Sequence, residues 1–490
     1  MNLSLCAGLL AAAVLLAGSA AAEPPHAEDC TGWFARLDET VDRAGTRDAG
    51  SHRISGFPYL RSDRFLASFR KEVSGDPATF AVWLNHLRLL DEKARVYELR
   101  NLPFAYLRPL GVSDSTAAIV KTNACAAELS RTDLSKSSQK TALIAQAAVP
   151  DEYIERNRIL GLYPLATLPF SIGIAHWQNE TVTMFWRTVA SDPENDTATR
   201  YEPGEKPADA TQIQVIFTRT ARDRLGIPQF SIADRERLFR TFAPIFEIST
   251  SGQYDRFGPL TWGTGLTPEV DVARPTVYRR LAFTRYRDRV LVQLIYTIWF
   301  PERPHADSVD LLAGKLDGLI FRVTLDSNGS PLVYDSIHPC GCYHMFFPTA
   351  RAKVKPSPQP GIEWALVPAT LPAVGPERRI VLQTSSGSHY LHGLRFDTGS
   401  RGIAYGFAEE DELRALPTID GTTRSAFGPD GIITGTERGE RLLFWPTGVA
   451  DTGAMRQWGR HATAFLGRRH FDDSDLIEQR FSIPALPEAQ

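Results

Sequence analysis

Four side chains that could bind a metal or act as nucleophiles alternate within one seven-residue segment, 338–344. They are His338, Cys340, Cys342 and His344. Thiolates and imidazoles are the soft ligands and the nucleophiles of protein chemistry. No other stretch of the 490 residues concentrates reactive side chains in this way. The segment is therefore the first candidate for a functional site.

The spacing of the two cysteines bears on what they can do. In an extended strand, side chains two positions apart lie on one face, about 6.6 Å apart. That separation is too wide for a disulfide, whose Cβ atoms lie about 3.8 Å apart. Pro339 and Gly341 suit the second and fourth positions of a type I turn over residues 338–341. The sequence predicts that the chain bends here and can bring the two sulfurs together.

Three interpretations of the segment stay open. In the first, Cys340 and Cys342 form a local disulfide or share bridges with other cysteines, and a bridge over one residue would be strained and readily reduced. In the second, His338, Cys340, Cys342 and His344 hold one Zn or Cu ion, although zinc sites usually have two to four residues between cysteines. In the third, a thiolate is the nucleophile, His338 or His344 is the base, and Asp335 orients it.

Further histidines could support such a site. His389 and His392 lie in a predicted strand, where residues three apart face opposite sides. His461 lies in an arginine-rich segment, and His470 precedes two carboxylates that could serve a metal or acid–base site. Histidines in such positions are more often packed in the core or exposed on the surface than part of a functional site. A spatial cluster of three or more of the named histidines and cysteines would indicate an enzyme or metal centre.

Familiar catalytic signatures are absent from the sequence. It contains no glycine-rich phosphate loop, no Gly-x-Ser-x-Gly elbow, no His-Glu-x-x-His motif and no Cys-x-x-Cys-His haem attachment. The reaction, the ligand and the oligomeric state therefore do not follow from a motif.

The N-terminus has the features of a secretory signal, residues 1–22. An apolar run ends in three alanines before Glu23, and small residues at these positions suit cleavage after Ala22. No later segment has eighteen uncharged apolar residues, so no membrane span is expected after cleavage. The sequence predicts an exported protein, periplasmic or extracellular.

Composition and the number of cysteines limit the class of protein to which the chain can belong. Hydrophobic residues make up 43% and charged residues 23%, as in folded globular domains. A net charge of −3 gives no reason to expect a nucleic-acid partner. Cys6 would leave with the signal, and export permits disulfides. We therefore predict that Cys30 and Cys125, both in the N-terminal part, form one.

The residue pattern changes character near residue 165. Residues 23–165 predict a helical N-terminal domain, because apolar residues recur at helical spacing in 64–70, 80–90 and 132–147. Residues 166–490 predict a β-rich domain, with a possible sub-boundary near 351–378. β-Branched and aromatic runs predict strands at 213–218, 276–284, 290–300 and 441–445, and a hairpin of 319–325 and 331–337 turning at Asn328-Gly329. The expected fold is α+β, a helical domain followed by a larger, mainly antiparallel β domain.

Two classes of function remain. In one, the protein is an exported enzyme or metalloprotein with a Cys/His metal or thiol site at 338–344. In the other, it is an envelope binding or assembly protein, and its cysteines form only structural disulfides. The flanking histidines favour the first class, because a loop that is merely tied by a disulfide has no need of them.

Overall fold

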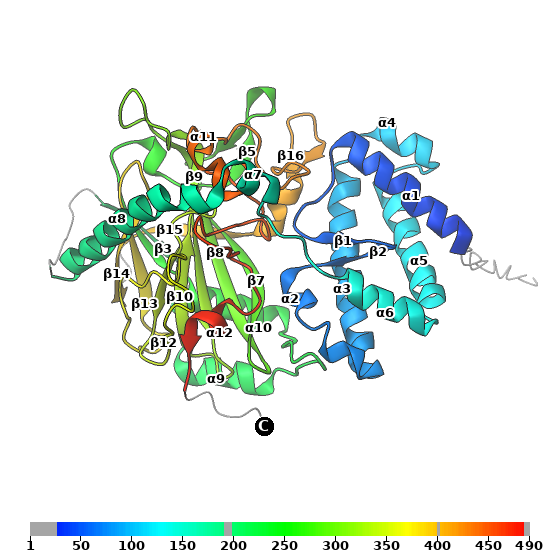
Figure 1. Ribbon diagram of the computed structural model, residues 1–490, viewed down its shortest axis with the longest axis horizontal. Helices are drawn as coiled ribbons and strands as arrows, with labels where there is room; N and C mark the ends of the chain where they lie inside the picture. Colours follow the sequence, from blue (N-terminus) through cyan, green and yellow to red (C-terminus); the bar gives the residue numbers. More distant parts are fainter. Residues whose placement is uncertain (1–26, 191–197, 399–401, 485–490) are drawn as a thin grey trace, which may run out of the picture.

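The computed structural model describes residues 27–190, 198–398 and 402–484. The predicted signal segment, residues 1–22, lies outside them. The chain folds into a helical N-terminal part and a larger part built on one extended sheet (Figure 1). The predicted α+β class is confirmed.

The N-terminal helices surround one hydrophobic core. The elements are α1 (Ala27–Ala44), α2 (Arg64–Ala67), α3 (Pro77–Arg100), α4 (Phe104–Leu107), α5 (Ser115–Asp133) and α6 (Ser137–Gln146), with a hairpin of β1 (His52–Ile54) and β2 (Phe57–Ser62). Asp76 begins α3 by accepting hydrogen bonds from two backbone N–H groups, and Pro77 takes the first helical position. Buried Trp33, Trp83 and Leu87 belong to the shared core.

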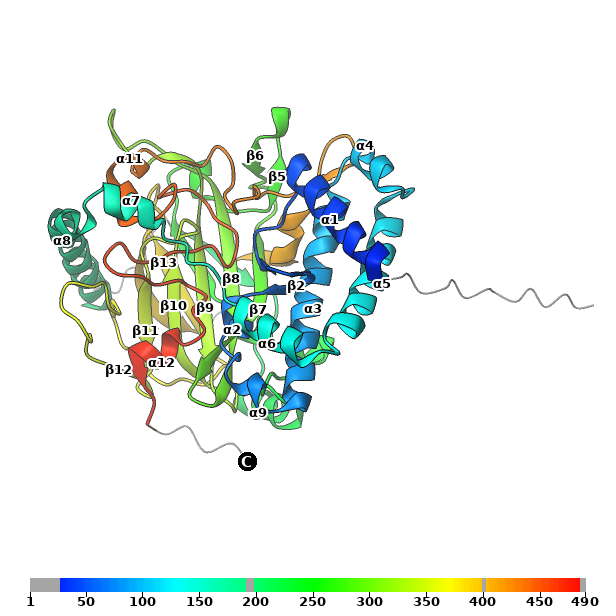
Figure 2. The same cartoon turned by 45° about the vertical axis from the view of Figure 1, so that its right-hand side comes forward.

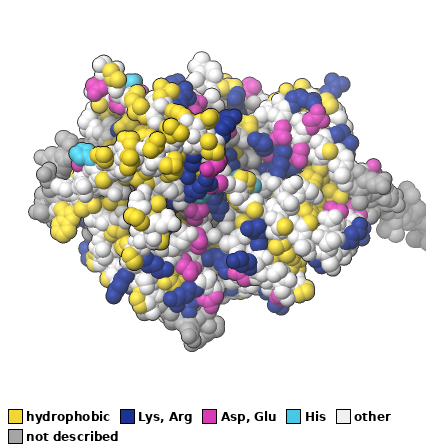
Figure 3. Space-filling view, viewed as in Figure 1, with side chains coloured by type: hydrophobic (Ala, Val, Ile, Leu, Met, Phe, Trp, Pro, Cys, Tyr) yellow, Lys and Arg dark blue, Asp and Glu magenta, His cyan; other side chains and the backbone are white. Residues whose placement is uncertain are grey.

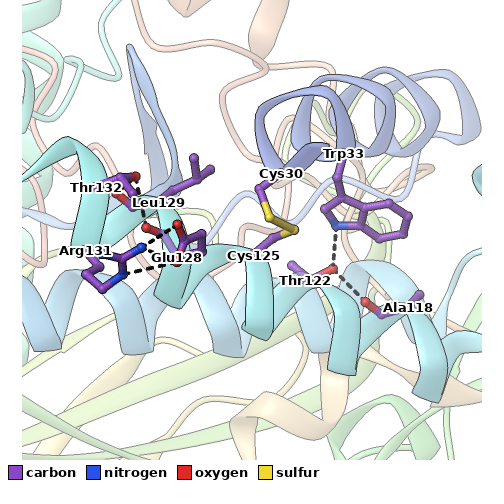
Figure 4. Close-up of a disulfide and its surroundings, with 9 residues drawn as sticks. All are labelled: Cys30, Trp33, Ala118, Thr122, Cys125, Glu128, Leu129, Arg131 and Thr132. Carbon is purple, nitrogen blue, oxygen red and sulfur yellow. Dashed lines mark hydrogen bonds and ion pairs between the residues drawn. A yellow bond between two sulfur atoms is a disulfide. The ribbon is translucent and has the colours of Figure 1, made fainter. Parts of the chain in front are cut away.

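A disulfide ties the first helix of this part to a later one. Cys30 on α1 is bonded to Cys125 on α5 (Figure 4), 95 residues further along the chain. Beside it, the Trp33 indole donates a hydrogen bond to Thr122 of the same helix pair at 3.2 Å. In the chain-entropy description, closing so long a loop contributes about 4 kcal/mol to stability. The pairing predicted from the cysteine count is present.

Ten strands form the main sheet, in the order β11-β10-β9-β8-β7-β15-β3-β4-β13-β14. Neighbours pair antiparallel except β15 with β7, β15 with β3, and β13 with β4. The strands are β3 (Ala198–Pro203), β4 (Ile245–Ser249), β7 (Thr276–Tyr286), β8 (Arg289–Arg303), β9 (Gly314–Leu325), β10 (Pro331–Ile337), β11 (Met345–Pro348), β13 (Arg379–Thr384), β14 (Leu391–Asp397) and β15 (Ile403–Glu409). The predicted hairpin of β9 and β10 is present, with Gly329 at φ +85° in its turn.

Both faces of this sheet are covered. One face packs against α8 (Tyr163–Ala190), α9 (Ala210–Arg219) and α10 (Ile232–Phe242), through side chains such as Phe185, Ile216 and Phe239. The other face meets the C-terminal segment, where Phe471 packs on Ile295 and Ile337. Alternate residues of one strand therefore enter two different layers. Figure 2 shows α8 at the outer edge of the molecule, away from the N-terminal helices.

Short elements complete the fold. They are α7 (Glu155–Leu160), α11 (Arg441–Phe444), α12 (Leu476–Arg480), β5 (Leu260–Trp262), β6 (Pro268–Val270), β12 (Lys353–Val354), β16 (Leu416–Pro417), β17 (Thr423–Arg424) and β18 (Phe481–Ser482). The expected domain boundary at residue 165 falls inside α8, so the helical segment continues past it.

Two strand predictions are wrong. Residues 213–218 belong to the helix α9, and residues 441–444 form α11. In α9, Ile213, Ile216 and Phe217 are buried together, a helical spacing that the β-branched composition concealed. Asp209 also caps this helix by accepting from the Gln212 N–H. The local β propensity was overridden by the capping residue and by burial on one helical face.

Candidate functional site

The segment 338–344 begins with a tight turn at the end of β10. The Gly341 N–H donates to the His338 carbonyl at 2.8 Å, and the His338 N–H donates to the Cys342 carbonyl at 3.0 Å. Gly341 has φ +92°, and a Cβ added there would lie 2.4 Å from the Ala462 carbonyl oxygen. Only glycine fits this position. The predicted bend over residues 338–341 is therefore present.

The turn separates the two histidines. Ser336 and His338 face the layer that contains α8, because both line one cavity with residues of that helix. Asp335 alternates to the opposite layer, where His344 Nε2 lies 2.9 Å from its carboxylate and Arg322 binds the same carboxylate. The structure thus gives His338 and His344 different aspartate partners and does not bring the two imidazoles together.

The two cysteines do lie together. The Cys342 N–H donates to Cys340 Sγ at 3.4 Å, and both thiols are free. A separate side-chain hydrogen bond between the two thiols, together with burial, raises the pKa of the Cys342 thiol well above its usual range. Within the described residues, no group of three or more His, Cys, Asp and Glu side chains is placed to hold a metal ion.

His338 instead belongs to a buried chain of titratable groups. Asp317 on β9 lies 3.1 Å from His338 Nδ1 through one carboxylate oxygen and 2.9 Å from His389 Nδ1 through the other. On its far side, His389 Nε2 lies 3.1 Å from the Tyr254 carbonyl oxygen and 3.4 Å from Asp255. The His389 ring stacks on Phe300 with centroids 3.8 Å apart.

The partners determine where the protons are. Burial alone would raise the pKa of Asp317, but His338, His389 and Arg438 lower it well below its usual range. An ionised carboxylate only accepts, so both Nδ1 atoms facing it carry protons. The Tyr254 carbonyl also accepts only, so His389 carries a second proton and is a cation. Consistent with this, Asp255 and Asp317 raise the pKa of His389 against the effect of burial.

His338 has the opposite character. Burial lowers its pKa, and the attraction of Asp317 offsets this only in part. The ring is therefore neutral near pH 7, with its proton on Nδ1 and a lone pair on Nε2. That Nε2 is buried and has no hydrogen-bond partner among the described residues. This is the arrangement of an imidazole ready to accept a proton.

His338 is one of the residues that line a cavity of about 100 Å³. Ser336 lies two residues before His338 on the same side of β10, and its buried Oγ also lacks a partner within the part of the chain that the structure describes. The remaining wall is mostly apolar and aromatic, with Trp177, Met184, Leu319, Tyr343 and Tyr390 among its residues, and it also includes Glu180 and Thr181. Two residues with buried, unpaired polar atoms therefore line one small, mostly apolar cavity.

The aromatic wall is itself held by hydrogen bonds. The Tyr390 hydroxyl donates to the Tyr343 hydroxyl at 2.6 Å and accepts from Arg303 at 3.1 Å. Trp177 of α8 packs over Tyr343 with ring centroids 5.4 Å apart. Tyr343 adopts φ +61°, which is uncommon for a bulky residue. Trp177 of α8, Tyr343 and Tyr390 thus form the aromatic wall of the cavity that His338 lines.

The other histidines do not join this site. His461 is buried against Phe471, and its pKa is lowered to about 3, mainly by burial. His470 lies between Asp151 and Asp473, which raise its pKa to about 9 against the effect of burial. His392 lies in β14 as predicted, and burial lowers its pKa. Of the histidines named from the sequence, only His338 and His389 share a partner.

Asp317 and Ser336 were missed by the sequence analysis. Ser336 carried a usable signal, because it lies two positions before His338 at the end of a predicted strand, and alternation places both on one side. Asp317 and Asp255 carried no comparable signal in the sequence, because an isolated aspartate before a predicted strand is common.

Comparison of the chain with protein-family models, with curated proteins and with solved structures found no match. None of the described helices is both long enough and apolar enough to cross a bilayer. The function must therefore be argued from the site itself.

Proposed function

We propose that the protein is an exported hydrolase of small acyl compounds, with Ser336 as nucleophile, His338 as general base and Asp317 as the residue that orients His338. One observation carries the proposal: Ser336 and His338 line one cavity, Ser336 Oγ and His338 Nε2 are buried and unpaired within the described chain, and Asp317 holds His338 Nδ1. Nucleophile, base and orienting carboxylate are the components of acyl transfer by serine.

The proposed reaction has two halves. As the Ser336 hydroxyl oxygen attacks the carbonyl carbon of the substrate, His338 Nε2 takes its proton. The bond from that carbon to the leaving group then breaks, and His338 returns the proton to the leaving group. Water hydrolyses the acyl-serine by the same proton transfers. A cavity of about 100 Å³ suits an acyl group of a few atoms.

A small sulfonyl fluoride tests the proposal directly. Methanesulfonyl fluoride should sulfonylate Ser336 with loss of fluoride, detected by mass spectrometry of the peptide that contains this residue. His338→Gln should slow labelling about 10²- to 10⁴-fold, the usual contribution of a general base. The matched control is His344→Gln, since His344 is equally buried and paired with an aspartate but lines no part of this cavity.

The rate of ester hydrolysis is a second test of the proposed activity. Wild-type protein should hydrolyse p-nitrophenyl acetate, and Ser336→Ala should reduce the rate to that of buffer. Unlabelled Ser336 together with no hydrolysis of small esters would refute the proposal. A labelling rate that does not depend on His338 would refute the assignment of the base.

The metal or thiol site at 338–344 is a second candidate, favoured by the two free thiols in contact at Cys340 and Cys342. Paired thiolates suit Zn or Cu(I). Binding by all four side chains predicted from the sequence would require His338 and His344 to leave their aspartates.

Metal analysis tests this second candidate. Protein purified from the exported fraction without chelators should contain zinc or copper in proportion to the chain, and Cys340→Ser should abolish it. Cys30→Ser is not a suitable control because it breaks the disulfide, whereas His470→Gln leaves all four predicted ligands in place. A metal-free wild type with two titratable thiols would refute this candidate.

A further inference from the structure

The N-terminal half of α8 presents an apolar surface to solvent. Between Arg158 and Glu180 the chain contains no Asp, Glu, Lys or Arg. Leu165, Leu168 and Ile172 recur at helical spacing and are 64%, 66% and 73% exposed. They lie on a different side of the helix from Trp177, Thr181 and Met184, which line the cavity.

Neighbouring elements extend this surface. Ile159 and Leu160 of α7, Leu162, and Leu442 and Leu443 of α11 are each more than half exposed. Phe170 of α8 packs on Phe444 of α11 with ring centroids 5.3 Å apart, so the two helices are in contact. Figure 3 shows hydrophobic side chains gathered over the region where Figure 1 places α7, α8 and α11. We call these eight residues the α7–α8–α11 surface: Ile159, Leu160, Leu162, Leu165, Leu168, Ile172, Leu442 and Leu443.

The chemistry of this surface fits lipid better than protein. A contiguous exposed apolar surface marks a site of interaction. Protein interfaces usually combine an apolar centre with many hydrogen-bonding groups. Here, every exposed residue of α8 from Pro164 to Ala175 is apolar or glycine. A hydrocarbon layer is the partner that requires no polar contacts.

Positive charge stands next to the apolar residues. Arg156 on α7 lies one helical turn before Leu160 and is exposed, and Arg441 lies immediately before Leu442 with its side chain 46% exposed and 3.6 Å from Asp451. Exposed Glu155 lies beside Arg156 and pairs with Arg468, so the border carries both signs of charge, and the apolar side chains themselves are what match acyl chains.

We propose that the α7–α8–α11 surface binds the face of a phospholipid bilayer, with α8 lying in the plane of the membrane. The inference is independent of the proposed hydrolase activity. Because α8 also forms one wall of the cavity, binding would hold that wall at the lipid surface.

Vesicle flotation tests the proposal with the exported protein and vesicles of equal phosphatidylcholine and phosphatidylglycerol. Wild-type protein should float with the vesicles. The variant Leu165→Ser/Leu168→Ser/Ile172→Ser should bind at least about tenfold more weakly, because the apolar contact is lost. The matched control, Val120→Ser/Ile232→Ser/Ile419→Ser, removes three apolar residues elsewhere that are at least as exposed, and it should bind like wild type.

A second variant and the melting temperatures show whether weaker binding reflects a folding defect. Leu442→Ser/Leu443→Ser on α11 should weaken binding in the same direction, and all variants should keep the wild-type melting temperature. No flotation of the wild type, or equal flotation of the triple α8 variant, would overturn the proposal. A wild-type dimer that the α8 variant converts to a monomer, without vesicle binding, would also overturn it and assign the surface to a second copy of the chain.

Discussion

Asp317→Asn is expected to slow acylation of Ser336 by about 10²- to 10⁴-fold. Asp317 accepts hydrogen bonds from His338 Nδ1 and His389 Nδ1 through its two oxygens. An amide has one oxygen and one NH₂ group, so it can accept from only one of the two rings. Since His389 is held as a cation by its other partners, the NH₂ group would face His338.

The consequence for His338 is a change of tautomer. With Nδ1 facing an N–H donor, the proton of the neutral ring moves to Nε2, and the lone pair no longer faces the cavity. The measurement is the rate of sulfonylation by methanesulfonyl fluoride, with Asp326→Asn as the matched substitution of a buried aspartate in the turn that follows the same strand. An unchanged rate in Asp317→Asn would contradict the assigned role.

The pH profile separates this effect from a structural one. Because burial lowers the pKa of His338, its neutral form persists below the ordinary histidine value near 6.5, and the wild-type rate should fall only at more acidic pH. Asp317→Asn should remain slow across the neutral and alkaline range, since raising the pH does not restore the lone pair on Nε2. A wild-type acid limb centred above pH 6.5 would contradict the proton assignment.

The second large effect concerns stability. Asp335→Ala is expected to destabilise the protein by about 3–5 kcal/mol, because it leaves a buried cation without its counter-charge. Arg322 Nε donates to Asp335 at 2.9 Å, and both side chains are almost fully buried between β9 and β10. His344 loses its partner in the same change. Urea unfolding of wild type and variant measures the difference.

Two controls show whether burial is the cause. Glu39→Ala removes the partner of Arg43 in an ion pair whose side chains are 67% and 63% exposed, and it should change stability little. The double variant Arg322→Met/Asp335→Leu removes both charges and should recover part of the loss. Equal losses in Asp335→Ala and in the double variant would show that packing, and not the unpaired charge, is responsible.

Prediction from sequence worked where the deciding contacts are local. Apolar residues at helical spacing were sufficient to predict α3, and alternation with the Asn328-Gly329 turn was sufficient to predict the hairpin of β9 and β10. The turn at residues 338–341 likewise depends on two residues within it. The failures at 213–218 and 441–445 came from short apolar runs, in which helix and strand have similar composition.

The proposed site overlaps the predicted segment only in part. The sequence singled out residues 338–344 through their cysteines and histidines, and His338 and Tyr343 of this segment line the cavity. The sequence grouped His338 with His344 because they lie only six positions apart. The structure separates them, because the turn between them gives each a different aspartate partner. Ser336 was overlooked because a serine in a strand is ordinary until a base is placed beside it.

Periodicity, turn residues and the count of cysteines are enough to predict the α+β division, the hairpin that carries Ser336, the turn that follows it and the Cys30–Cys125 pairing. The partner and the proton of each histidine depend on tertiary contacts. Asp317 lies 21 residues from His338 and 72 from His389, and these groups meet because neighbouring strands and a distant loop converge on one end of the sheet. Burial there then sets the charge of each imidazole, and no spacing along the chain records it.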